Sequence, residues 1–269
     1  MHQTVTGKPP IFQAAQIVKI EKRHREYIYM ALDSPYIALN ALPGQFVMIK
    51  LPDADDLILP RPFDIVTADS AKGEIELVIK ITGKGTHRLS HKKPGELLLL
   101  TGPLGRGITD FTGDSSIGLL VRGVGAAAVV LLANRAKEKG IKVVTFLSAS
   151  TKERLVCREY LEPLSHTVFI ATDDGTEGYR GNAWEMLDSF LDKTALDQIY
   201  TCGSRRFARH IKKLDSEGKT RGFVFLEGFM ACGMGDCHGC AVKKAKEEGY
   251  FLVCQDGPVF PVGVVEIKS

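Results

Sequence analysis

Cys232-Gly-Met-Gly-Asp-Cys237-His-Gly-Cys240, followed by Cys254, is the stretch of this sequence that decides how the chain is organised. It holds four of the six cysteines, in the spacing C-x4-C-x2-C-x13-C. An iron–sulfur cluster needs four thiolates that converge on a compact inorganic core, and two close spacings followed by a distant fourth cysteine are typical of plant-type [2Fe–2S] centres. We therefore predict that Cys232, Cys237, Cys240 and Cys254 bind a [2Fe–2S] cluster.

Glycines separate the cysteines of this loop, at Gly233, Gly235 and Gly239. Glycine adopts positive φ without a steric penalty, so it suits a loop that must turn back sharply to present three thiolates. A structural zinc site and a disulfide are the alternatives, but zinc ribbons usually pair two C-x2-C motifs and disulfides need an oxidising compartment. A Rieske centre would replace two cysteines with histidines, so we expect His238 not to be a ligand.

The composition is that of an ordinary soluble globular protein, with 269 residues, 44% hydrophobic residues, 25% charged residues and a net charge of +3. No run of Lys and Arg resembles a nucleic-acid-binding arm. No apolar run approaches the length of a membrane-spanning helix, and residues 1–7 lack the basic and apolar regions of a signal peptide. The sequence therefore predicts a cytoplasmic protein that binds no nucleic acid and does not span a membrane.

The first hundred residues are predicted to form a small antiparallel β-barrel or sandwich. Short segments rich in β-branched and aromatic residues recur there, separated by turn signals such as Pro43-Gly44 and Pro94-Gly95. Short strands at regular spacing are typical of these all-β folds. The expected strands are residues 12–20, 27–32, 45–51, 74–81 and 96–100.

Two pieces of this region are suited to bind phosphate. In Arg61-Pro62-Phe63-Asp64, the flanking prolines would hold the guanidinium in a fixed direction, as a bidentate clamp on phosphate requires. The other interpretation of Arg61 is a solvated residue at a sheet edge. A second piece, Gly83-Lys-Gly85-Thr86, opens a short helix and would offer free N–H groups to an anion, or is simply a strand-to-helix turn.

The middle of the chain is predicted to be a parallel α/β domain. Apolar strands alternate with helices of about ten residues, which is typical of βαβ units. The expected strands are 117–121, 142–147, 167–171 and 198–201, and the expected helices are 126–133, 152–160, 184–191 and 205–214. Open parallel sheets bind ligands at the carboxyl ends of their strands. We expect a nucleotide there, beside Gly123, Gly125, Asp173, Cys202 and Gly203.

The Gly123-Val-Gly125 turn is a modest signal for a nucleotide diphosphate, and tight packing of strand against helix is the other reason for such glycines. Arg122 precedes this turn, where it could block the close approach of a dinucleotide or add a charge to its phosphates. The alternative role of Cys202, and the one we expect for Cys157, is that of a small buried apolar residue.

The first two regions resemble the ferredoxin–NADP reductase superfamily. The resemblance is carried by Arg61-Pro-Phe-Asp64, Gly85-Thr86, Gly102-Pro-Leu-Gly105 and the residues 172–181 and 202–203. It implies FAD bound by Arg61, Pro62, Phe63, Asp64, Val78, Ile79, Lys80, Gly85 and Thr86, with Cys202 and Gly203 near the nicotinamide. Asp64 departs from the pattern, which usually has Ser or Thr there, so the tuning of the flavin is in question.

The C-terminal segment of the chain resembles one subfamily of this superfamily in particular. Residues 227–240 and 254–260 are similar, residue by residue, to the C-terminal signature of the electron-transfer subunit of the NAD-dependent, two-subunit dihydroorotate dehydrogenases. This implies an oxidoreductase of pyrimidine biosynthesis that uses FAD, a [2Fe–2S] cluster and NAD. It also implies a catalytic, FMN-containing partner that carries the substrate chemistry, in a heterotetramer of two subunits of each kind.

We therefore expect three domains: a FAD-binding β-barrel at 1–112, a NAD-binding α/β domain at 113–222 and a [2Fe–2S] domain at 223–269. Residues 241–248, with their run of Lys and Glu, are expected to be helical and solvated. Two other functions stay open. One is an NAD(P)H reductase subunit of the diaphorase type that serves a hydrogenase or another oxidoreductase. The other is a binding or regulatory module without nucleotide reactivity, as Arg122 and Asp64 suggest.

Overall fold

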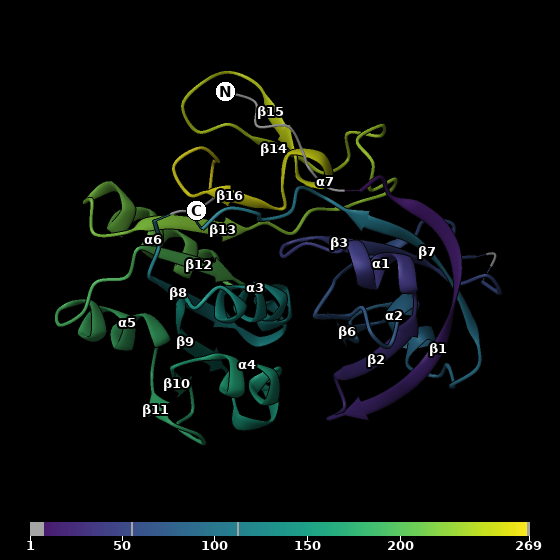
Figure 1. The fold of residues 1–269 in the computed structure, drawn as a ribbon, viewed down its shortest axis with the longest axis horizontal. Coiled ribbons are helices and arrows are strands. Elements are labelled where there is room, and N and C mark those ends of the chain that lie inside the picture. Colours follow the sequence, from purple (N-terminus) through teal and green to yellow (C-terminus); the bar gives the residue numbers. More distant parts are fainter. Residues whose placement is uncertain (1–7, 55, 112, 268–269) are drawn as a thin grey trace. The chain divides into compact units, whose positions relative to one another are not determined.

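The computed structural model describes residues 8–54, 56–111 and 113–267, which form two compact units (Figure 1). The first unit takes in the chain up to Thr109 together with residues 227–241 and 251–258. The second takes in residues 110–226, 242–250 and the chain from Val259 onward. The tail is thus shared between the two units, and the predicted boundaries of three domains remain a prediction.

The first unit is built on an antiparallel sheet in the order β4-β3-β7-β1-β2-β6-β5, as expected for a β-barrel domain. Its strands are β1 (Ile11–Arg23), β2 (Tyr27–Asp33), β3 (Phe46–Lys50), β4 (Arg61–Asp64), β5 (Thr67–Asp69), β6 (Glu74–Lys80) and β7 (Leu97–Leu104). The long strand β1 pairs with β7 through its first half and with β2 through its second half, so it joins the two halves of the sheet. Two short helices, α1 (Pro35–Asn40) and α2 (Lys84–Leu89), complete this part.

The second unit is a mostly parallel sheet in the order β11-β10-β9-β8-β12-β13-β16, again as predicted. Its strands are β8 (Ser116–Arg122), β9 (Lys142–Ala149), β10 (Thr167–Thr172), β11 (Tyr179–Arg180), β12 (Gln198–Cys202), β13 (Arg221–Phe225) and β16 (Val259–Pro261). Its helices are η1 (Gly123–Ala126), α3 (Ala127–Glu138), η2 (Lys152–Arg154), α4 (Arg158–Leu164), α5 (Ala183–Leu191) and α6 (Arg205–Ser216). Among the described strands of this sheet, β16 alone runs antiparallel, beside β13. The strands that we expected for this domain did not include β11, β13 or β16.

Two predicted helices are wrong. The helix expected at 152–160 is instead the short η2 and then α4, because Cys157 between them has φ +61°, which no α-helix accommodates. The helix expected at 241–248 begins instead as β14 (Ala241–Lys243), which pairs with β15 (Tyr250–Leu252). The short helix α7 (Val253–Asp256) follows. Strand pairing therefore overrides the helical preference of the Lys and Glu residues in this segment.

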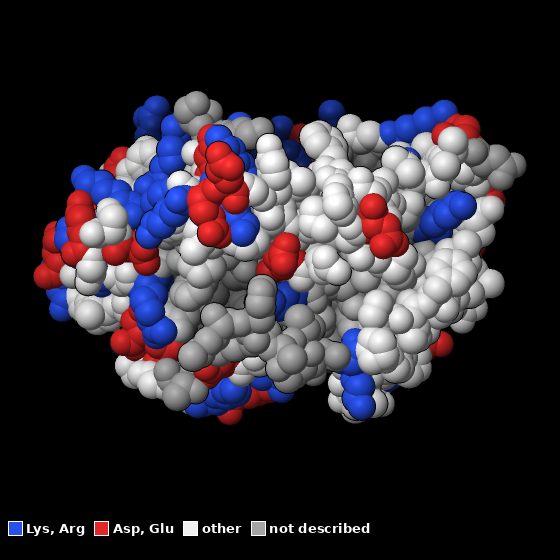
Figure 2. All heavy atoms as spheres, turned by 90° about the horizontal axis from the view of Figure 1, so that it is seen from above, with Lys and Arg blue, Asp and Glu red and all other residues white. Residues whose placement is uncertain are grey.

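None of the helices in the described part of the chain has the length and apolar character that crossing a membrane would require. Residues 1–7, whose sequence predicts no signal peptide, lie outside the described residues. On the face drawn in Figure 2, basic and acidic groups lie beside one another, with broad uncharged areas between them. Ion pairs occur among the described residues, such as that of Lys244 with Glu247 at 2.8 Å.

Candidate functional site

The four predicted cluster ligands all lie in the first unit, on two of its three chain segments. Cys240 and Cys254 are buried, with their Sγ atoms 3.2 Å apart, whereas Cys232 is half-buried and Cys237 is exposed. The four cluster cysteines are thiols and form no disulfide. The site therefore has two buried thiols, Cys240 and Cys254, which we call the inner pair, and two outer thiols, Cys232 and Cys237.

Backbone N–H groups point at the outer thiols. The amides of Met234 and Cys237 donate to Cys232 Sγ at 3.4 and 3.5 Å, and the amide of Gly239 donates to Cys237 Sγ at 3.5 Å. Burial raises the pKa of the Cys232 thiol, but these donors outweigh it and bring that pKa down to about 7. The loop is thus built to stabilise thiolate, which is the form that binds metal.

In the inner pair, the pKa of the Cys254 thiol is raised rather than lowered. Burial, together with the neighbouring Cys240 thiol, raises the pKa of Cys254 to about 12, because two negative charges at this distance repel in a buried site. Iron ions would offset that repulsion. Within the described residues, no three His, Cys, Asp or Glu side chains surround a single point. The donor set, four thiols of which two already lie side by side, fits a two-iron cluster with two thiolates on each iron.

The turns of the loop are only partly those we predicted. Gly233 and Gly235 have φ of +74° and +95°, as expected for a loop that folds back. Gly239 has no positive φ; its neighbour His238 does, at +56°. A Cβ atom at Gly233 would lie 2.6 Å from Met48 Cγ, so this glycine lets the loop pack directly on β3.

The residues predicted to bind FAD come from β4, β6 and α2 of the first unit. Arg61 begins β4, and its side chain lies against Gly85 in the first turn of α2, where a Cβ atom would be 2.8 Å from Arg61 Cζ. Thr86 Oγ1 accepts hydrogen bonds from the amides of Thr82 (2.9 Å) and Gly83 (3.1 Å), which fixes the turn. The structure therefore brings the Arg61 guanidinium and the Gly85-Thr86 turn together, as a phosphate clamp requires.

The other predicted flavin residues lie on the same strands. Pro62, Phe63 and Asp64 are half-buried on β4, which pairs with β3. On β6, Val78 and Ile79 are 5% and 1% exposed, so their side chains belong to the core of the first unit. Lys80, the last residue of β6, is exposed.

The carboxyl group of Asp64 has an unusually high pKa. Burial of its carboxyl group and, to a smaller extent, the carboxylate of Glu227 at the start of the cluster loop together raise the pKa of Asp64 from 3.8 to about 7. A carboxyl group with this pKa is largely protonated just below neutral pH, and can then donate a hydrogen bond. The Ser or Thr expected at this position would also be a neutral donor, so Asp64 preserves that property in its protonated form.

In the second unit, the turns after β8 and β12 meet. A Cβ atom at Gly125 would lie 2.7 Å from the backbone of Cys202 and Gly203, and Gly203 has φ +86°. Gly123, with φ +53°, opens onto free space, since a Cβ atom there would have no neighbour within 4 Å. Cys202 is 3% exposed. The structure therefore brings together, at the carboxyl ends of β8 and β12, four residues that we predicted to bind a nucleotide: Gly123, Gly125, Cys202 and Gly203.

Asp173 lies at the same end of the sheet, where its side chain pairs with that of Arg122, a residue that we did not predict as a ligand. The two side chains form a bidentate ion pair, with Nη1–Oδ1 and Nη2–Oδ2 distances of 3.1 and 2.5 Å. They are 51 positions apart in the sequence. A basic residue before the glycine turn and an acidic residue after a parallel strand were the only signals that could have suggested the pair.

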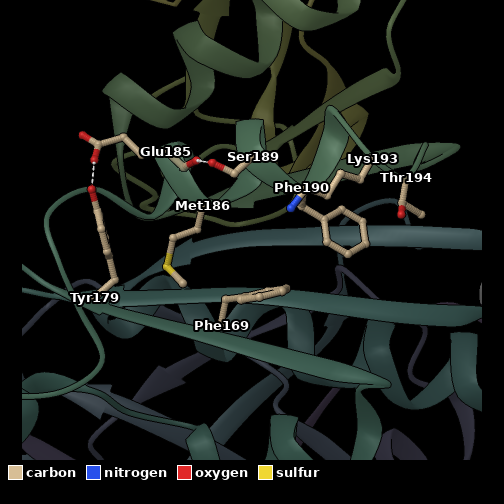
Figure 3. Close-up of a pocket in the computed structure, with 8 residues that line it drawn as sticks. All are labelled: Phe169, Tyr179, Glu185, Met186, Ser189, Phe190, Lys193 and Thr194. Carbon is tan, nitrogen blue, oxygen red and sulfur yellow. Dashed lines mark hydrogen bonds between the residues drawn. The ribbon is translucent and has the colours of Figure 1, made fainter.

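A separate cavity of about 470 Å³ lies between α5 and the β10–β11 edge of the second unit (Figure 3). It is lined by Phe169, Tyr179, Glu185, Met186, Ser189, Phe190, Lys193 and Thr194. The Tyr179 hydroxyl donates to Glu185 at 2.6 Å on one side of it. No residue that the sequence predicted as a ligand lines this cavity.

Comparisons with known proteins agree with both parts of the chain. Residues 16–107 match the oxidoreductase FAD-binding domain, and residues 227–266 match the iron–sulfur cluster binding domain of dihydroorotate dehydrogenase B. The solved structure of an NADH-dependent reduced ferredoxin–NADP oxidoreductase, studied for electron bifurcation, is 27% identical and covers 99% of this chain and 91% of its own, with a TM-score of 0.84. The ferredoxin reductase of carbazole 1,9a-dioxygenase, at 21% identity over 81% of this chain and 70% of its own, shares the fold with a TM-score of 0.67. The predicted fold class and the FAD and [2Fe–2S] domains are confirmed.

Three relatives carry the same description, the electron transfer subunit of dihydroorotate dehydrogenase B (NAD(+)). The protein of Desulforamulus reducens is 36% identical over 87% of this chain and 90% of its own length. That of Bacillus mycoides is 36% identical over 93% and 96%, and that of Streptococcus pneumoniae is 34% identical over 82% and 88%. The chain belongs to the family of electron transfer subunits of dihydroorotate dehydrogenase B.

Proposed function

We propose that this chain transfers electrons between NAD and a catalytic partner subunit that oxidises dihydroorotate, through its own FAD and [2Fe–2S] cluster. The observation that carries the proposal is the placement of all four cluster cysteines in the same compact unit as the matched FAD-binding domain. The substrate and NAD are taken from the relatives' description. We also assign the protein to the cytoplasm, where thiols stay reduced, because the four predicted cluster ligands must be reduced to bind iron.

The residues of the chain would divide this work. FAD, when bound, accepts or releases a hydride on one side and single electrons on the other, so it links NAD to a one-electron cluster. Arg61 and the first turn of α2 would hold a flavin phosphate, and protonated Asp64 would donate a hydrogen bond to the ring system. Cys232, Cys237, Cys240 and Cys254 would hold the cluster. The turns at Gly123–Gly125 and Cys202–Gly203 would receive the dinucleotide.

The cluster loop also supports a docking surface for the partner. Phe229 is 95% exposed and Met234 is 47% exposed, and both belong to the same chain segment as Cys237, the exposed cysteine of the set. Aromatic residues and methionine are enriched at protein interfaces, and electron transfer requires the cluster to lie near the acceptor. We propose that a partner containing FMN binds over this loop, in a heterotetramer of two subunits of each kind.

Co-expression with the catalytic subunit of a dihydroorotate dehydrogenase B tests the proposal. The co-purified complex should contain FAD, FMN, iron and sulfide, and dihydroorotate should reduce NAD+ only when both subunits are present. Phe229→Ser should weaken the complex. Phe12→Ser, which removes another exposed aromatic side chain (69% exposed) from the same unit, should not. A purified chain with no flavin in its visible spectrum, or bound flavin that NADH does not reduce, would refute the function.

A second candidate is a reductase subunit that exchanges electrons between pyridine nucleotide and a different oxidoreductase. The observation that favours it is the likeness, along nearly the whole chain, to the NADH-dependent reduced ferredoxin–NADP oxidoreductase. The partner decides between the two. Under this second function the chain would still reduce its FAD with NADH, but dihydroorotate would not reduce NAD+ in the co-expressed complex.

A further inference from the structure

The sheet of the second unit has an open edge beside the cavity drawn in Figure 3. β10 pairs with β9 along its whole length, from Thr167 to Thr172. On its other side, β11 pairs only with the last two residues, Ala171 and Thr172. Within the described part of the chain, no strand pairs with residues 167–170 on that side. An open strand edge presents unpaired N–H and C=O groups, which can pair with a strand of another chain.

Val168 and Ile170 are the residues of this stretch that face the open edge. Alternate residues of a strand direct their backbone groups to opposite edges, and Thr172, in step with these two, accepts a hydrogen bond from the Gly181 amide beside β11 at 3.1 Å. Natural proteins usually protect such an edge with charged residues or proline. β10 contains neither, and residues 167–170, Thr-Val-Phe-Ile, are all half-buried. The edge is therefore suited to pair with an added strand.

The cavity lies where side chains of an added strand would point. Successive side chains of a strand point to opposite faces of a sheet, so those on the α5 side would enter the space of about 470 Å³ between α5 and this edge. Figure 3 shows Phe169, Met186 and Phe190 around the middle of that space. Phe169 also stacks on Phe146, with ring centroids 5.1 Å apart. The cavity is thus lined by packed aromatic residues and suits large apolar side chains.

The two ends of the cavity differ in charge. Tyr179 and Glu185 close one end with their hydrogen bond of 2.6 Å, whereas Lys193 and Thr194 lie at the other end (Figure 3). Among the described residues, no carboxylate pairs with the Lys193 ammonium group. An acidic side chain of an added strand would complement this charge.

We propose that β10 binds an extended segment of a partner protein, by addition of a strand along residues 167–170. The segment has large apolar side chains at two alternate positions, which enter the cavity, and an acidic side chain that pairs with Lys193. This site lies in the second unit and is independent of the docking surface proposed above, which lies in the first.

Two synthetic peptides with capped ends serve as probes, Glu-Thr-Phe-Thr-Phe-Thr and Thr-Phe-Thr-Phe-Thr-Glu, which carry the acidic residue at opposite ends. Calorimetry with the full-length, cofactor-loaded chain should show that one of them binds, and hydrogen exchange should show that it protects the amides of Val168 and Ile170. Val168→Pro removes an outward N–H from an edge strand, where proline is tolerated, and should raise the dissociation constant at least about tenfold. Val168→Ala keeps the N–H and should bind the peptide as the unmodified chain does.

A charge exchange tests the acidic end of the segment. Lys193→Glu should weaken binding of the same peptide at least about tenfold, and a peptide with Lys in place of Glu should restore it. This exchange decides by itself if Val168→Pro does not fold. If neither peptide binds the unmodified chain, or if a folded Val168→Pro binds it equally well, the inference is wrong. A chain that is dimeric in sedimentation until Val168→Pro makes it monomeric would also overturn it, because a second copy then occupies the edge. None of these outcomes bears on the proposed function.

Discussion

Replacing Asp64 with Asn tests whether a protonated carboxyl group is part of this fold. Asp64 ends β4, beside the predicted FAD site, and its pKa is raised from 3.8 to about 7 by burial and then by Glu227. Asparagine has nearly the same shape and keeps an N–H donor, but it never ionises. The variant therefore removes the ionisation of this side chain and changes little else in the structure.

The sign of the effect follows from the direction of this shift. Between pH 3.8 and about 7 the folded chain holds a proton on Asp64 that the unfolded chain has lost. The stability from this group is therefore complete below the unfolded pKa and is lost as the pH rises through the folded pKa. From about pH 5 to about pH 8 the free energy of unfolding of the unmodified chain should fall by about 2.5 kcal/mol relative to Asp64→Asn.

Urea denaturation at these two pH values, followed by circular dichroism, measures the difference. Infrared spectroscopy adds a direct check, because a protonated carboxyl band present at about pH 6 in the unmodified chain should be missing from Asp64→Asn. Glu227→Gln is the matched control, and should shift the titration of Asp64 to lower pH without abolishing it. A stability difference that stays the same at both pH values would refute a raised pKa at Asp64.

Three further substitutions test the cofactor sites. Cys237→Ser should abolish the [2Fe–2S] absorption bands and the bound iron while FAD stays bound, and retention of a full iron content would show that this thiol is not a ligand. Gly85→Ala should weaken FAD binding, because its Cβ atom would lie 2.8 Å from Arg61 Cζ and displace the guanidinium. Gly83→Ala is the control, since its Cβ atom would meet no atom within 4 Å, and it should leave FAD binding unchanged. Fluorescence titration with FAD measures both affinities, and equal affinities would contradict the phosphate clamp. Gly125→Ala should destabilise the second unit by about 1–3 kcal/mol, as overpacking does, because its Cβ atom would lie 2.7 Å from the backbone of the β12 turn. Thermal unfolding followed by the fluorescence of the single tryptophan, which lies in α5 of that unit, detects this change, and an unaltered melting temperature would argue against the close packing.

Much of the fold could be predicted because its signals are local. The strands of both sheets follow from runs of apolar and β-branched residues, and the turns between them from glycine and proline. The cysteine spacing was equally informative, since a cluster fixes the number and kind of its ligands. These signals depend on a residue and its near neighbours in the sequence, so one sequence is enough to detect them.

One wrong prediction and two features that the sequence did not reveal share a physical cause, namely contacts between distant parts of the chain. Residues 241–248 have a helical composition, but pairing with β15 makes a strand of their first part. The Arg122–Asp173 pair joins residues 51 positions apart, and no local pattern announces such a partner. The pKa of Asp64 likewise depends on Glu227, from a segment far along the sequence. In each case, tertiary contacts decide what the local sequence leaves open.

The first unit is assembled from the beginning of the chain and from two segments near its end, with strands β8 to β13 of the second unit encoded between its first two segments. During translation, β3 and β7 therefore leave the ribosome well before the loop that will cover Met48 and Leu104. Cys254 emerges last of the four thiols. Iron delivery must consequently wait for an almost complete polypeptide, and a product truncated before residue 254 would retain a strand framework for flavin but lack the fourth ligand of the cluster.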